Sequence, residues 1–195
     1  TDLPLVPLIE EHQRSGNIVT LALRSHGPAL HIAYAAAGRR VTDIRNKLET
    51  GDEGTHLFTG IYACSPAIHD WLTPGKVESV IHIFLEMIRR GVKVGAVVLD
   101  EGQWWDLGSR TQYLAAHAAL NGMHGPAIHP EANVSADTIL RRTNVIGPGA
   151  IVEPGCQLED CILWPHAKVV TGARLTRCII RSHITAAGTF EDVDF

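Results

Sequence analysis

The chain has 195 residues, of which 45% are hydrophobic and 19% charged, so it can bury the core of one large or two small domains and is not disordered. Its formal net charge of −4 leaves no excess of basic residues, which excludes nucleic acid as an expected partner. Because no apolar run reaches the roughly 18 residues of a membrane span and the first residues lack a signal-peptide pattern, we expect a cytoplasmic protein without a membrane partner.

Helical and strand patterns alternate over the first two-thirds of the chain. The spacing of Leu3, Leu5, Val6, Leu8 and Ile9 predicts a helix that ends near Gly16. Strands are predicted over 17–23, 31–34, 41–44, 56–63 and 92–99, and a helix can start at Pro66. Two further helices are predicted, one with a buried face of Val77, Val80, Ile81, Phe84, Leu85 and Ile88, and one over 110–120 with Tyr113, Leu114 and Ala118 inward. This order predicts an α/β layer domain.

A different periodicity begins after Gly122. Aliphatic residues return every six positions, with one five-residue step, at Ile128, Val134, Leu140, Ile146, Val152, Leu158, Leu163, Val169 and Leu175. Neither the helix period of 3.6 nor the strand period of 2 explains this spacing, whereas a parallel β-helix does. Since three such segments close one coil, these nine predict about three coils, and strands of a sandwich, which return at 8 to 12 residues, fit less well.

Cysteine and histidine residues do not indicate a metal centre or a disulfide framework. The four cysteines, Cys64, Cys156, Cys161 and Cys178, include no C-x-x-C pair, so we expect buried free thiols. Five histidines lie on unlike elements without ligand spacing: His12, His117, His129, His166 and His183.

Several segments together resemble one known family. They are TDLPLVPLIEEHQRSGNIVTLAL, FTGIYACSP, WWDLGSRTQYLAAHAAL and NVIGPGAIVEPG, in this order along the chain. The chain resembles the C-terminal half of a sugar-phosphate nucleotidyltransferase of the GDP-mannose pyrophosphorylase (mannose-1-phosphate guanylyltransferase) or glucose-1-phosphate nucleotidylyltransferase kind. The resemblance implies a partial Rossmann-like nucleotidyltransferase domain over 1–122 and a short left-handed parallel β-helix over 123–195.

The resemblance also implies a reaction. The family transfers a nucleotidyl group from an NTP to a sugar 1-phosphate, releases pyrophosphate and uses Mg²⁺ to meet the charge on the phosphates. Asp106 corresponds to the family's second metal-binding aspartate, which makes it the candidate catalytic and metal-binding residue. The alternative is that Asp106 caps the following helix, but Ser109 already suits that role.

Candidate sugar-phosphate residues lie in two other segments. In VTDIRNKLE, Asn46 and Lys47 stand where the family has a glutamate and a lysine, so Lys47 could meet the phosphate as a point charge. The change to Asn46 leaves the sugar undefined, and an ordinary solvated lysine is the alternative for Lys47. In LFTGIY, Thr59 and Gly60 match a strand that the sugar packs against, although the glycine could equally relieve strand packing.

The family's glycine-rich nucleotide loop, G-x-G-T-R-L, does not occur in the chain. We therefore expect a truncated product, a fragment or a chain that needs a partner, in which nucleotidyl transfer depends on a missing N-terminal segment. One alternative is a non-catalytic subunit that forms a homo-oligomer, or binds a catalytic homologue, through the β-helix around Trp164. A hexapeptide acyltransferase with His129 or His166 as general base is a third, weaker possibility.

Overall fold

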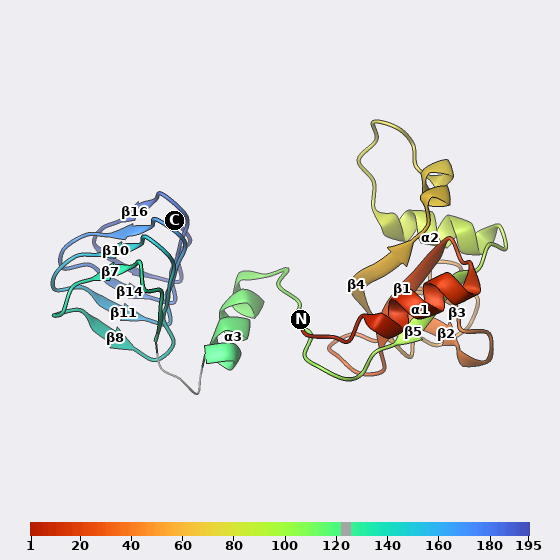
Figure 1. Cartoon of the computed structure of the whole chain (residues 1–195), viewed down its shortest axis with the longest axis horizontal. Coiled ribbons are helices and arrows are strands. Elements are labelled where there is room, and N and C mark those ends of the chain that lie inside the picture. The colour runs from red at the N-terminus through yellow and green to blue at the C-terminus, as the bar shows by residue number, and fades with distance from the viewer. Residues whose placement is uncertain (122–125) are drawn as a thin grey trace. The chain divides into compact units, whose positions relative to one another are not determined.

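The computed structural model describes residues 1–121 and 126–195, which form two compact units, Thr1–Trp104 and Trp105–Phe195. The domain boundary expected between 122 and 123 lies outside the described residues. Figure 1 shows a mixed sheet with helices in the first unit and a β-solenoid in the second. No helix within the described residues is long and apolar enough to cross a membrane.

The first unit is built on a five-stranded sheet with the order β2-β3-β5-β1-β4. β1 is parallel to β5 and antiparallel to β4, and β3 is antiparallel to both β2 and β5. Its elements are α1 (Val6–Ser15), β1 (Val19–Arg24), β2 (Ile32–Ala35), a 3₁₀ turn η1 (Ala36–Gly38), β3 (Arg40–Ile44), β4 (Leu57–Cys64), a 3₁₀ turn η2 (Pro66–Trp71), α2 (Val80–Arg89) and β5 (Val94–Val98).

The core of this unit lies on both faces of β1. Alternate β1 residues, such as Leu21, pack with Phe84 of α2, whereas Ala22 on the opposite face packs with Leu8 of α1. Because side chains alternate across a strand, the two helices cover opposite faces of the sheet. This explains why every residue of β1 is buried.

Two predicted helices begin later than their apolar patterns suggested. The α2 helix starts at Val80 because the Ser79 hydroxyl caps it by accepting a hydrogen bond from the Ile81 amide. Val77 therefore lies outside the helix and is fully exposed, so its placement on the buried face was wrong. The α1 helix starts at Val6, and Leu5, Val6 and Ile9 of its apolar pattern are exposed. A helix does start at Pro66, and it is the 3₁₀ helix η2.

The second unit consists of α3 (Arg110–Asn121) and a solenoid of short parallel strands. Over residues 126–195 the strands form three four-stranded sheets, so the described solenoid has four coils where the sequence predicted about three. The strands are β6 (Ala127–Ile128), β7 (Asn133–Val134), β8 (Ile139–Arg141), β9 (Val145–Ile146), β10 (Ile151–Val152), β11 (Gln157–Glu159), β12 (Ile162–Leu163), β13 (Lys168–Val169), β14 (Arg174–Thr176), β15 (Ile179–Ile180), β16 (Thr185–Ala186) and β17 (Thr189–Glu191).

The nine aliphatic residues of the six-residue pattern all lie in solenoid strands. From Ile146 to Leu175 they are buried in the interior, together with Cys156, Cys161 and Cys178. The extra coil continues the pattern less regularly, through Ile180 and Ala186. Three of the four thiols are therefore buried as expected, whereas Cys64 at the end of β4 is exposed, against the prediction.

The α3 helix packs on the solenoid sheet β6-β9-β12-β15. The outward residues Ile162 and Ile179 of this sheet are aliphatic and nearly buried, and Ile162 lines a cleft of about 360 Å³ with Leu114 and other α3 residues. Ala116 is the buried α3 residue, whereas Ala118, predicted to point inward, is exposed. An aliphatic outer face on a sheet requires cover, and α3 supplies it.

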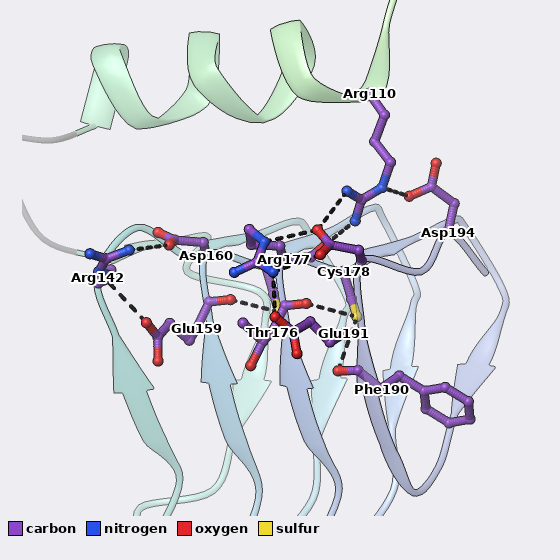
Figure 2. A network of polar contacts seen from close by, with 12 residues as sticks. Arg110, Arg142, Glu159, Asp160, Thr176, Arg177, Cys178, Phe190, Glu191 and Asp194 are labelled. Carbon is purple, nitrogen blue, oxygen red and sulfur yellow. Dashed lines mark hydrogen bonds and ion pairs between the residues drawn. The ribbon is translucent and has the colours of Figure 1, made fainter.

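A network of ion pairs holds the start of α3 to the last coil, as Figure 2 shows. The Arg110 guanidinium pairs with Asp194 at 2.6 Å and with Asp192 at 3.2 Å, and it also donates to the carbonyl of Arg177. Hydrogen bonds from Arg177, supported by the charge of Arg110, lower the pKa of Asp192 to about 2. The ion pairs of Asp192 with Arg110 and Arg177 therefore require an ionised Asp192, whereas the Arg110–Asp194 pair does not.

Candidate functional site

A tight turn after β3 presents the candidate sugar-phosphate lysine. Arg45 and Asn46 both have positive φ angles, of 58° and 51°, and the Lys47 amide donates to the Ile44 carbonyl at 3.2 Å. Asparagine tolerates the left-handed conformation better than most residues, which gives Asn46 a conformational role in addition to its predicted ligand role. The side chains of Asn46 and Lys47 are exposed and lie in the same turn.

The buried carboxylate of Asp43 holds this turn in place through hydrogen bonds to its backbone. Its carboxylate is only 1% exposed and accepts hydrogen bonds from the amides of Ile44 at 2.6 Å and Leu48 at 3.1 Å, with longer contacts to Thr50. Amide donors that surround a buried carboxylate satisfy it in the absence of a cation. Sequence analysis missed Asp43, because an aspartate between Thr42 and Ile44 in a strand does not differ locally from an outward-facing one.

Two histidines join the turn to the beginning of β4. The Arg45 amide donates to the His31 carbonyl at 2.7 Å, and the His31 amide donates to the His56 carbonyl at 2.9 Å. Burial lowers the pKa of both imidazoles, and the charge of Arg45 lowers that of His31 further. Both rings are therefore neutral near pH 7 and can act as hydrogen-bond donors and acceptors without adding charge.

The candidate residues Thr59 and Gly60 form a bulge in β4. The pairing with β1 shifts register here, so that residues 59–61 lie opposite Ala22 alone. The buried Thr59 hydroxyl donates to the Ala22 carbonyl at 2.8 Å, and Gly60 is exposed with a φ of 82°. A Cβ at Gly60 would meet nothing within 4 Å, so relief of strand packing is not the reason for this glycine. The positive φ is.

The first tryptophan of the G-Q-W-W-D segment contacts the same bulge. The Trp104 indole donates to the Thr59 carbonyl at 2.8 Å, and Trp104 is the last residue of the first unit. This bond satisfies a carbonyl in the irregular part of β4. Trp104 thus has a structural role at the candidate site that the sequence did not specify.

Asp106 belongs to the second unit, where it precedes α3. Its side chain is exposed, and one carboxylate oxygen accepts a hydrogen bond from the Gly108 amide at 2.9 Å. The helix cap is Ser109, whose hydroxyl accepts a long bond from the Gln112 amide and donates to the Gln112 side chain. The capping alternative for Asp106 is therefore not what the structure shows, and within residues 1–121 and 126–195 its second carboxylate oxygen accepts no hydrogen bond.

The residues suit Mg²⁺ only in part. Within residues 1–121 and 126–195, no group of three or more histidine, cysteine or acidic residues could hold a metal ion. A magnesium ion is commonly bound by one or two carboxylates plus substrate phosphates and water. Asp106 can supply one such carboxylate, so the donor set fits Mg²⁺ that is also bound by phosphate.

A further polar cluster lies where the parallel strands β1 and β5 end. Arg24 is 7% exposed and donates to the carbonyls of Asp100 and Gly102 and to the His26 ring. Asp100 accepts from the amide and hydroxyl of Ser25, at 2.8 and 2.7 Å. Partial burial opposes ionisation of Asp100, but the Ser25 bonds, with His26 and Arg24, outweigh it and lower its pKa. Carboxyl ends of parallel strands are the usual ligand edge of α/β sheets.

Comparison with known proteins identifies a similar enzyme. No protein-family model matches the chain. The UTP–glucose-1-phosphate uridylyltransferase of Synechocystis sp. is 22% identical over 215 aligned residues, which cover 89% of this chain and 54% of that enzyme. The chain is similar to a sugar nucleotidyltransferase. It spans about half the length of this relative, and the similarity supports the broader resemblance without selecting a GDP-mannose or glucose type.

Proposed function

We propose that the chain is the sugar-phosphate part of a sugar-1-phosphate nucleotidyltransferase, which converts an NTP and a sugar 1-phosphate to an NDP-sugar and pyrophosphate. The observation that carries the proposal is the extent of the similarity, since 89% of the chain aligns with one sugar nucleotidyltransferase. The alignment extends over both units, because 89% of the chain is longer than the larger unit, Thr1–Trp104.

The turn after β3 is the proposed phosphate site. Lys47 supplies a mobile positive charge, Arg45 supplies a second one, and Asp43 fixes the backbone between them. The neutral His31 ring beside Arg45 adds hydrogen-bonding capacity for a hydroxyl or phosphate oxygen. A small anion with several hydroxyl groups matches this combination.

The open face of Gly60 is the proposed contact for the sugar ring. No side chain projects from Gly60, and the space that a Cβ would occupy is empty. A ligand can therefore approach the β4 backbone closely at this point. Thr59 is buried beneath it and positions the bulge through its bond to Ala22.

Asp106 is the proposed magnesium ligand of this chain. Bound Mg²⁺ would neutralise charge that develops on the phosphates during transfer. Asp106 contributes one carboxylate oxygen, and its side chain is oriented by the Gly108 amide. The remaining ligands and the nucleotide-binding loop have no counterpart that we identify in this sequence.

Binding of glucose 1-phosphate and mannose 1-phosphate to the full chain tests the proposal. We expect titration calorimetry to show binding that Lys47→Gln weakens about tenfold, the effect of one lost charge-assisted bond. Lys76→Gln is the matched control, because Lys76 is an exposed lysine paired with Glu78 before α2. Equal loss in both variants, or no binding of either sugar phosphate, would refute the assignment.

A further inference from the structure

Two histidines, His166 and His183, are stacked at one corner of the solenoid. Their ring centroids are 5.2 Å apart and their ring planes differ by 13°. His166 lies in the turn between β12 and β13, and His183 lies in the equivalent turn between β15 and β16. They are 17 residues apart in the sequence, like Lys168 and Thr185, which pair between β13 and β16. One coil of the solenoid therefore brings the two imidazoles side by side, although their spacing fits no local ligand pattern.

The corner leaves both imidazoles accessible. Both side chains are exposed, and no hydrogen bond or ion pair within residues 1–121 and 126–195 engages either ring. The preceding coil has Gly149 at the same corner position, where its φ of 64° matches the 61° of His166 and the 64° of His183. A Cβ at Gly149 would come within 2.4 Å of Nδ1 of His166, so the glycine makes room for this ring. The nitrogens of the pair are therefore free to bind a ligand from solution.

We propose that His166 and His183 together bind one divalent transition-metal ion of the Zn²⁺ type. Imidazole nitrogen is a preferred ligand of zinc, at a distance of about 2.0–2.1 Å. Two such nitrogens on a tetrahedral ion lie about 3.3 Å apart, so the outer edge of each ring must move by about 1 Å from the observed stack. Rotation about the Cβ–Cγ bond of histidine has broad minima, which allows exposed rings to make this movement. Water completes the coordination of the ion.

The chemistry of this histidine pair differs from that of the magnesium ligand proposed at Asp106. A hard cation such as Mg²⁺ prefers oxygen ligands, whereas imidazole nitrogen suits zinc and copper. Two protein ligands are fewer than the three or four of catalytic and structural zinc centres, so we expect an exchangeable ion of modest affinity. Because the two ligands belong to successive coils and separate on unfolding, the bound ion should stabilise the folded solenoid.

Titration of the full chain with Zn²⁺ tests this site. All proteins carry Cys64→Ser, because the exposed thiol of Cys64 would itself bind zinc. We expect calorimetry to show a zinc site that His166→Gln or His183→Gln weakens about tenfold or more, and for which an excess of Mg²⁺ does not compete. His129→Gln is the matched control, because His129 is exposed in the equivalent turn between β6 and β7, where its ring accepts a hydrogen bond from the Glu131 amide.

Combining the two substitutions distinguishes one shared ion from two independent ligands. If both rings bind the same ion, the chain with His166→Gln and His183→Gln together should bind zinc little more weakly than either single variant, because the loss of one ring already ends chelation. Zinc should also raise the melting temperature of the Cys64→Ser chain, and each single substitution should abolish this rise. Circular dichroism without metal shows whether the variants retain the fold.

Four results would overturn the proposal. They are the absence of zinc binding, unchanged zinc affinity in either single variant, losses that add in the double variant, and an equal loss in His129→Gln. The last result would show that zinc binds to solenoid histidines in general and not to the stacked pair.

Discussion

Gly95 in the centre of the sheet offers a test of how closely the first unit is packed. It pairs with Thr20 of β1 on one side and with Arg40 of β3 on the other. A Cβ added to Gly95 would lie 2.1 Å from the Asn17 side-chain nitrogen, a buried atom without a hydrogen-bond partner. An ordinary van der Waals contact between these two atoms would need more than an ångström of additional separation. We therefore expect Gly95→Ala to destabilise the unit by about 2 kcal/mol, in the range typical of overpacked interiors.

Hydrogen exchange measures this effect within one unit. Because about 1.4 kcal/mol corresponds to a factor of ten, amides of β1 and β5 in Gly95→Ala should exchange roughly thirtyfold faster. Peptides from residues 127–195 provide the internal control and should not change. Asn17→Ala removes the atom that collides and should alone alter stability by less than about 1 kcal/mol, since its nitrogen makes no bond.

The double variant decides between explanations. If the collision with Asn17 is the cause, Asn17→Ala should restore most of the protection lost in Gly95→Ala, giving a coupling of about 1–2 kcal/mol. If the double variant is as unprotected as Gly95→Ala, the destabilisation has another source, such as strand pairing at position 95, and the reasoning from the close approach fails.

Three further predictions concern single side chains. A thiol reagent should modify Cys64 rapidly in the folded chain and reach the three solenoid cysteines only on unfolding; four fast thiols would contradict the fold. Asp43→Asn should destabilise the chain by about 1–3 kcal/mol, because a buried carboxylate acceptor is lost, and should lower the sugar-phosphate affinity measured by calorimetry. Unchanged affinity would show that Asp43 does not support sugar-phosphate binding. Since Arg177 lowers the pKa of Asp192 to about 2, the stability this carboxylate contributes is present above its usual pKa and lost as pH falls from about 4 to 2. The melting temperature of Asp192→Asn should therefore fall less over this pH interval than that of the unsubstituted chain. Equal falls in the two proteins would show that the Arg177–Asp192 pair does not contribute to stability.

The solenoid was the part of the fold that the sequence predicted best. Each strand has two or three residues, and one aliphatic residue per segment points inward, so the periodicity is visible within twenty residues. The fourth coil was missed because Ala186 replaces a larger aliphatic residue there and the spacing from it to Phe190 is four. The start of α2 was missed because a cap, Ser79, ended an apolar pattern that continued upstream to Val77.

The candidate site was only partly accessible to sequence reasoning. Lys47, Asn46, Thr59 and Gly60 were proposed through family resemblance, and their roles as ligands stay predictions. His31 and His56 were not noticed, because nothing in their spacing indicates that β2 and the start of β4 lie together. Their meeting depends on sheet pairing between residues more than twenty positions apart.

The sequence by itself determined the element types, the solenoid and the family resemblance, since these follow from local periodicity and short motifs. Tertiary structure alone decided which polar groups are buried and which strand lies at the edge. Asp43 became the anchor of a turn because three amides and one hydroxyl converge on it, and β4 became an open edge because β1 occupies only one of its sides. The donors to Asp43 lie within seven residues of it, but its burial and the edge position of β4 both come from long-range packing, in which the free energy of a residue depends on neighbours that are distant in the chain.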